Sequence, residues 1–155
     1  MSTGGEQGPP EILRELLEEV VDGLGLEATV DVSEGAGRLE GVVSGGDLGL
    51  LIGRRGQTID AIQHLAQRIV FHGGSPETRV VVDADGYRGR REAELCEQAD
   101  EAAARAVSEG EPVALGAMTS AERRIVHEHL RDRGDVQTHS EGDEPERHLV
   151  VEPGP

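Results

Sequence analysis

The chain has 155 residues and a formal net charge of −16, and 35% of its residues are hydrophobic but only 1% aromatic. A core made of Leu, Ile, Val and Ala is modest in size, which favours two small sheet-and-helix units over one thick domain. The single cysteine, Cys96, excludes an internal disulfide, and no apolar run approaches the length of a membrane span. The N-terminus does not resemble a signal peptide, so we expect a cytoplasmic protein without membrane insertion.

The first half of the chain predicts six elements in the order α-β-β-α-α-β. Residues 1–10 are rich in Gly and Pro, and we expect them to form a disordered lead-in. After them, periodic apolar residues predict helices, and alternating apolar residues between turn signals predict strands. Asp47 is the expected N-cap of the second helix. The predicted elements are a helix over 11–24, strands over 26–32 and 38–43, a short helix to 51, a helix to about 72 and a strand over 78–83.

A G-x-x-G loop with two arginines separates the two adjacent helices, in the stretch LLIGRRGQTIDAIQ over residues 50–63. Gly53 and Gly56 allow positive φ angles and let a ligand approach the backbone without a Cβ in the way. The unpaired amides that open the next helix carry the positive end of its dipole, which favours an anion. Arg54 and Arg55 are therefore expected to contact phosphates, although a lone G-x-x-G also suits a tight turn between two core helices.

The helix after the loop is predicted to be amphipathic, because Ile59, Ile62, Leu65 and Ile69 recur at spacings of three and four residues. The motif, its place between two helices and the element order together resemble the type II KH domain, whose G-x-x-G loop clamps four nucleotides of single-stranded RNA or DNA. The P-loop pattern G-x-x-x-x-G-K is absent. The two isoleucines nearest the loop are expected to form an apolar floor under the bases. The expected RNA-binding residues here are Ile52, Gly53, Arg54, Arg55, Gly56, Gln57 and Ile59.

Positive charge is concentrated in two windows of an otherwise acidic chain. Residues 49–91 contain 7 arginines and 4 acidic residues, a balance of +3, and residues 118–133 contain 4 arginines and 3 acidic residues, a balance of +1. The remaining three windows carry −9, −6 and −5. All 15 basic residues are arginine, which suits bidentate phosphate contacts, although a coding bias would give the same count. The net charge therefore does not by itself argue against binding of a nucleic acid at these two windows.

The second half of the chain predicts a second unit in the order α-β-α-β-β. Its elements are a helix over 87–108, a short strand over 111–115, a helix over 119–133 and strands over 135–140 and 147–152. Thr119 and Glu122 have the spacing of a capping box at the start of the second of these helices. On that helix Arg123 and His127 lie four residues apart and share a face, which suits a phosphate clamp beside a planar ring. Alone, however, this pair is also what an ordinary helix surface shows.

The motif E-R-R-I-V-H over 122–127 and the later stretch S-E-G-D-E-P-E-R over 140–147 resemble the R-x-x-x-H domain, a small module that binds single-stranded nucleic acids. The resemblance implies that Arg123 and His127 form the clamp and that Arg124 and Arg147 support it. The two modules in this order resemble the bacterial Jag or KhpB family over roughly residues 10–152. Glu146 departs from the family, which often has an aromatic residue there, and so removes a stacking platform.

The resemblance implies an α+β fold with a KH domain over 11–85 and an R-x-x-x-H domain over 86–152. It also implies a single-stranded RNA-binding protein, an RNA chaperone or post-transcriptional regulator linked to cell elongation and envelope homeostasis. Single-stranded DNA is an alternative ligand. A small single-KH protein is the implied partner.

The sequence also has to be weighed against two other classes of function, an enzyme and a protein-interaction adaptor. An enzyme is not expected, because no set of nucleophile, base and orienting residue is visible. His127 and His129 cannot easily share a metal, since residues two apart on a helix point in nearly opposite directions. We therefore expect no metal or cofactor. The alternative is a protein-interaction adaptor, in which the acidic faces over 11–22 and 92–111 dock a basic partner and RNA binding is secondary.

Overall fold

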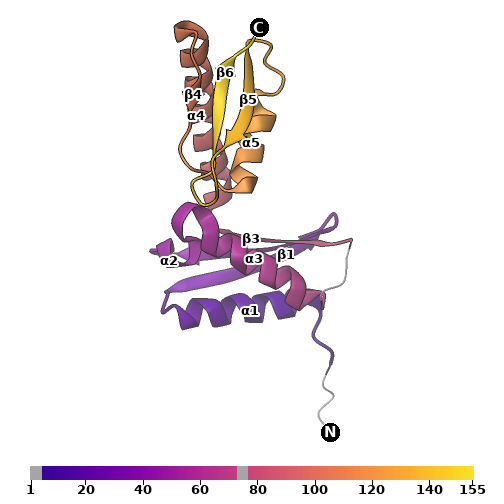
Figure 1. The fold of residues 1–155 in the computed structure, drawn as a ribbon. Coiled ribbons are helices and arrows are strands. Elements are labelled where there is room, and N and C mark those ends of the chain that lie inside the picture. The colour runs from indigo at the N-terminus through magenta and orange to yellow at the C-terminus, as the bar shows by residue number, and fades with distance from the viewer. Residues whose placement is uncertain (1–4, 73–76) are drawn as a thin grey trace. The chain divides into compact units, whose positions relative to one another are not determined.

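The computed structural model describes residues 5–72 and 77–155. The chain divides into two compact units, the first ending at Tyr87 and the second beginning at Arg88. Each unit has one three-stranded sheet with helices packed against it (Figure 1). Residues 1–4 of the expected lead-in lie outside the described residues. Within the two described ranges, no helix is both long and apolar enough to cross a membrane.

The first unit has the predicted element order. Its elements are α1 (Pro9–Gly23), β1 (Ala28–Gly35), β2 (Arg38–Gly45), α2 (Gly49–Ile52), a 3₁₀ turn (Arg54–Gly56), α3 (Gln57–Val70) and β3 (Arg79–Ala84). Helix α1 begins two residues before the predicted start, because proline fits the first turn of a helix, where its missing N–H is not needed. The N-cap of α2 is Leu48, one residue after the predicted Asp47, although the carboxylate of Asp47 does accept a hydrogen bond from the amide of Gly49 at 2.9 Å.

The sheet of the first unit has the order β1-β2-β3. Strands β1 and β2 form an antiparallel hairpin. Its two turn residues, Ala36 and Gly37, have φ angles of 52° and 71°, and positive φ at both positions is what a two-residue type I′ turn requires. Strand β3 pairs with β2 in parallel. Helices α1 and α3 bury Leu13, Leu17 and Ile59 against these strands in one hydrophobic core.

Helix α3 is rotated relative to the face that its apolar spacing predicts. Ile59 is fully buried as expected, and Ile62 is partly buried against the core, but Leu65 is 55% exposed and Ile69 is 45% exposed. The buried side of the helix continues instead through Ala66 and Val70. The predicted stripe is therefore wrong at its last two positions, and α3 leaves two large apolar side chains on the surface of the unit.

Two glutamines of α3 explain this rotation. Strand β3 lies at the edge of the sheet, where its outer amides lack a neighbouring strand. The side-chain carbonyl of Gln67 accepts a hydrogen bond from the amide of Val80 at 2.7 Å, and that of Gln63 accepts from Val82 at 2.9 Å. The glutamines must face the strand to satisfy these buried amides, and this turns the neighbouring leucine and isoleucine outward.

The second unit also has the predicted order. Its elements are α4 (Tyr87–Glu109), which starts at the last residue of the first unit, β4 (Val113–Ala114), α5 (Ser120–Leu130), β5 (Val136–Glu141) and β6 (His148–Pro153). The strands form an antiparallel sheet in the order β4-β6-β5. The core is closed by the alanine-rich face of α4, where small side chains allow close approach. Cys96 is only half-buried and lies beside this face.

The predicted capping box at the start of α5 is confirmed. The hydroxyl of Thr119 accepts a hydrogen bond from the amide of Glu122 at 3.3 Å, and the carboxylate of Glu122 accepts one from the amide of Thr119 at 3.1 Å. The same carboxylate, which is buried, also accepts from the guanidinium of Arg91 at 2.8 Å. This network fixes the start of α5 against α4, and with it the position of the residues that follow on α5.

Candidate nucleic-acid interface

The glycine loop is a tight turn between two helices, as predicted. Helix α2 ends at Ile52 and is followed by Gly53, whose φ of 72° and ψ of 176° are accessible essentially only to glycine. Gly56 has a left-handed conformation with φ 74° and immediately precedes α3. Between them Arg55 is also left-handed, with φ 56°, and the side chain of Arg54 is exposed to solvent. The loop thus presents arginine side chains at the amino-terminal end of a 14-residue helix.

Both glycines are also required by close packing. A Cβ on Gly53 would overlap the side chain of Thr58. A Cβ on Gly56 would lie 2.8 Å from the phenol oxygen of Tyr87 and 2.9 Å from a carbon of its ring. The role of Tyr87, the only tyrosine of the chain, could not be predicted, because nothing in the local sequence pattern indicates that it lies against the loop.

The apolar floor expected under the bases is only partly present. Ile59 is 0% exposed and belongs to the core, so it supports the loop from beneath and has no surface to offer to a base. Ile52 is half-buried and Gln57 is exposed. The expectation for Ile59 as a contact residue is corrected, because the start of α3 turns this side chain into the sheet.

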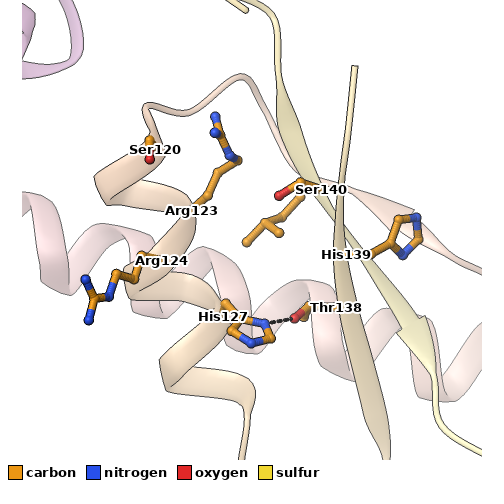
Figure 2. A pocket seen from close by; sticks show the side chains of 8 residues that line it. Ser120, Arg123, Arg124, His127, Thr138, His139 and Ser140 are labelled. Atoms are coloured by element: carbon orange, nitrogen blue, oxygen red, sulfur yellow. Dashed lines mark hydrogen bonds between the residues drawn. The ribbon is translucent and has the colours of Figure 1, made fainter. Parts of the chain in front are cut away.

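A pocket of about 400 Å³ lies between α5 and β5 in the second unit. It contains Arg123 and His127, which confirms that the two residues share a face, and Arg124 also lines it (Figure 2). The lining residues that come from the strands and from the start of α5 were not predicted from the sequence. The full lining is Ser120, Arg123, Arg124, His127, Thr138, His139, Ser140 and Leu149.

The imidazole of His127 is held by Thr138. Its Nδ1 lies 2.6 Å from the hydroxyl oxygen of Thr138 on β5, as Figure 2 shows. This contact orients the ring and leaves Nε2 available to a ligand in the pocket, as a donor or an acceptor according to the tautomer. Thr138 is therefore a positioning residue for His127 that the motif spacing alone could not indicate.

The two arginines of the motif helix have different surroundings. Arg123 is only 12% exposed: its Nη1 donates to the carbonyl oxygen of Met118 at 2.8 Å, and its Nη2 donates to the carboxylate of Glu144 at 2.9 Å. Arg124 is 79% exposed and pairs with Glu128 one turn further along the helix at 3.0 Å. In Figure 2 the side chain of Arg123 points away from His127. Arg124 is the more accessible of the two guanidinium groups.

Arg147 does not line the pocket. Its guanidinium donates to the carbonyl oxygen of Gly142 at 2.7 Å and so closes the loop over 142–147 that joins β5 to β6. The side chain of Arg147 therefore stabilises this loop, and its guanidinium already donates to a backbone carbonyl.

His139 lies on β5 but its side chain points to the opposite face from Thr138 (Figure 2). A hydrogen bond with Glu141 at 2.7 Å, together with the negative charges of Glu152 and Glu141, raises the pKa of His139 above its ordinary value. His139 therefore keeps its proton to a higher pH than a histidine of ordinary pKa does.

His127 and His129 contact different elements of the second unit. His129 pairs with Asp100 of α4 at 2.9 Å, whereas His127 faces β5, so the two rings diverge as the helix geometry predicts. Over residues 5–72 and 77–155, no group of three or more His, Cys, Asp or Glu residues is arranged to hold a metal ion. Partial burial and the charges of Glu92 and Asp100 raise the pKa of Cys96, which keeps its thiol protonated.

Comparison with known proteins accounts for both units. Residues 10–83 match the KH domain of KhpA and KhpB, and residues 93–153 match the R-x-x-x-H domain. The chain is 40% identical over 132 residues to the RNA-binding protein KhpB of Lactiplantibacillus plantarum, an alignment that covers 85% of this chain and 41% of that protein. It is 35% identical over 139 residues to KhpB of Clostridium symbiosum, covering 88% and 63%, and 30% identical over 137 residues to KhpB of Bacillus subtilis, covering 87% and 66%. The chain thus spans between 41% and 66% of the length of these curated relatives.

Proposed function

The chain belongs to the KhpB family, with a KH domain followed by an R-x-x-x-H domain, and from this premise we propose that it binds single-stranded RNA through both units. The observation that carries the proposal is the glycine loop. It places Arg54 and Arg55 at the start of α3, in a backbone conformation and a packing environment that only glycine allows at both ends of the turn. A chain of net charge −16 has concentrated positive charge at this turn.

In the KH unit, the proposed contact is with the phosphate backbone. The amides that open α3 and the two arginine side chains all favour an anion at the loop, and the glycines let the nucleic acid approach closely. Gln57 and Ile52 lie next to this surface and are proposed to contact the nucleotides. Each phosphate bound contributes roughly 0.7 to the log–log salt slope for a single strand, so affinity should fall steeply with salt.

In the R-x-x-x-H unit, the proposed contact is the pocket between α5 and β5. His127 offers Nε2 to a base edge or a phosphate oxygen, and Arg124 offers an accessible guanidinium beside it. The hydroxyls of Ser120 and Ser140 add neutral hydrogen-bonding groups to the same pocket. Arg123 forms part of the pocket wall, where its guanidinium is already paired with a carboxylate.

We also propose the finer role that the family resemblance implies. The protein would act in the cytoplasm as an RNA chaperone or post-transcriptional regulator linked to cell elongation and envelope homeostasis, together with a small single-KH protein. An adaptor role, in which protein contact is primary, is the second candidate. The observation that favours it is the exposure of Leu65 and Ile69 on α3, in addition to the acidic surfaces of α1 and α4.

The test is binding of a fluorescein-labelled single-stranded RNA, followed by anisotropy at two salt concentrations. The Arg54→Asp, Arg55→Asp double variant is expected to lose most of the affinity and about 1.4 of the log–log slope, since two phosphate contacts are removed. The control is Arg38→Asp with Arg68→Asp. It changes the net charge of the same unit by the same amount as the loop variant, but at the β1–β2 hairpin and in the last turn of α3. If both double variants lose the same RNA affinity, the loop arginines act only through the net charge of the unit. Failure of the wild type to bind RNA would refute the proposal.

A further inference from the structure

We propose that Glu144 is an affinity-determining residue of the pocket between α5 and β5, because its carboxylate occupies the part of Arg123 that a nucleic-acid phosphate would use. The proposal rests on the RNA-binding function proposed above. It assigns opposite roles to the two residues: Arg123 is the anchored cation, and Glu144 is an anion within the same chain that competes with the ligand for it.

The position of Arg123 is fixed independently of Glu144. Its Nη1 donates to the backbone carbonyl of Met118 at 2.8 Å, directly before the capping box that starts α5. Its side chain is only 12% exposed, yet it lines the pocket. The guanidinium is therefore held in place with its Nη2 side directed at the carboxylate of Glu144, 2.9 Å away. Carboxylate and phosphate oxygens both accept charge-assisted hydrogen bonds from a guanidinium N–H, so either anion can accept from this Nη2 group.

The loop that carries Glu144 does not depend on this contact. Within the loop, Arg147 donates to the carbonyl of Gly142 at 2.7 Å and the amide of Glu146 donates to the carbonyl of Asp143 at 2.8 Å. The amide of Met118 donates to the carbonyl of Arg147 at 3.0 Å and ties the loop to the segment before α5. The side chain of Glu144 is 60% exposed. Its carboxylate can therefore swing into solvent while the loop keeps its backbone bonds.

The ion pair between Arg124 and Glu128 differs from that between Arg123 and Glu144 in its exposure to solvent. Arg124 and Glu128 also pair at 3.0 Å, but their side chains are 79% and 49% exposed, so water and salt screen the interaction and Arg124 remains accessible. Arg123 is much less exposed, and its charge is screened less. Of the two acids beside the motif arginines, Glu144 is the one whose displacement RNA binding requires.

The test compares Glu144→Gln with Glu146→Gln in the same RNA-binding assay. Both variants remove one negative charge from the same loop, but only the first removes the charge that faces Arg123, and glutamine keeps a neutral acceptor for the guanidinium. We expect Glu144→Gln to bind RNA about two- to fivefold more tightly than Glu146→Gln, the range that corresponds to loss of a partly exposed ion pair. The excess should vanish when Arg123 is replaced by methionine.

Equal affinities of the two glutamine variants, or weaker binding by Glu144→Gln, would overturn the proposal and make Glu144 a brace of the loop. The NMR amide resonances of the loop residues show whether a variant perturbs the fold. If these resonances are unchanged in Glu144→Gln and its RNA affinity is not increased, the proposal is overturned. Failure of the proposed function is distinguishable, because it would appear as absence of RNA binding by the wild type or as insensitivity to His127→Ala with Arg124→Ala.

Discussion

The contact between Gly56 and Tyr87 predicts how costly a single methyl group is in the KH loop. Gly56→Ala adds a Cβ to a residue with φ 74°, where the atom would lie 2.8 Å from the phenol oxygen. Gly25, at the end of α1 in the same unit, has φ 68° and nothing within 4 Å of the corresponding position. Gly25→Ala therefore measures the conformational cost alone, and Gly56→Ala measures the same cost plus overlap with Tyr87.

The magnitudes follow from these two geometries. A left-handed conformation costs an alanine about 1–2 kcal/mol, so Gly25→Ala is expected to destabilise the first unit by that amount. Overlap with a packed side chain adds about 1–3 kcal/mol, so Gly56→Ala should cost about 2–5 kcal/mol in all. In the background of Tyr87→Ala the overlap is absent, and the cost of Gly56→Ala should fall to that of Gly25→Ala.

The assay is hydrogen exchange of the central amides of β2, such as Val43, which report on opening of the first unit alone. The four chains of the cycle are the wild type, Gly56→Ala, Tyr87→Ala and the double variant, and the coupling free energy is expected to be about 1–3 kcal/mol. The same cost for Gly56→Ala with and without Tyr87 would refute the reasoning. It would mean that the glycine is needed only for its φ angle and that the tyrosine does not hold the loop.

Three further predictions concern the second unit. Thr138→Val should keep the fold but weaken RNA binding severalfold, because His127 loses the contact that orients it, and Thr138→Ser should restore the affinity in the anisotropy assay. Thr119→Ala should cost the second unit about 0.5–2 kcal/mol through loss of the helix cap, seen by hydrogen exchange in β6 and not in β2. His139 should titrate above its ordinary pKa by NMR, and Glu141→Gln should lower it. Its pairing therefore stabilises the fold fully below the ordinary histidine pKa and is lost as the pH rises through the raised value, so a flat stability curve across that window would contradict the pairing.

Much of the candidate site could be predicted because its signals are local. The glycine loop, the capping box of Thr119 and Glu122, and the shared face of Arg123 and His127 each depend on residues at most four positions apart, whose geometry a helix or a turn fixes by itself. The element order of both units follows from apolar periodicity in the same way. These expectations agree with the structure.

Only the tertiary structure decided which side chains are accessible. Gln63 and Gln67 face the edge of β3, so that Leu65 and Ile69 are exposed against the apolar pattern. Ile59 is in the core although it adjoins the loop.

The partners that the site residues contact could likewise not be predicted from the sequence. Arg123 pairs with Glu144, 21 residues further along the chain, and His127 is oriented by Thr138, which is 11 residues away. Tyr87 lies against Gly56 from the start of the next helix. The physical reason is the same in each case: local periodicity determines which face of an element a residue lies on, whereas the partner that the residue meets depends on how segments distant in sequence pack together.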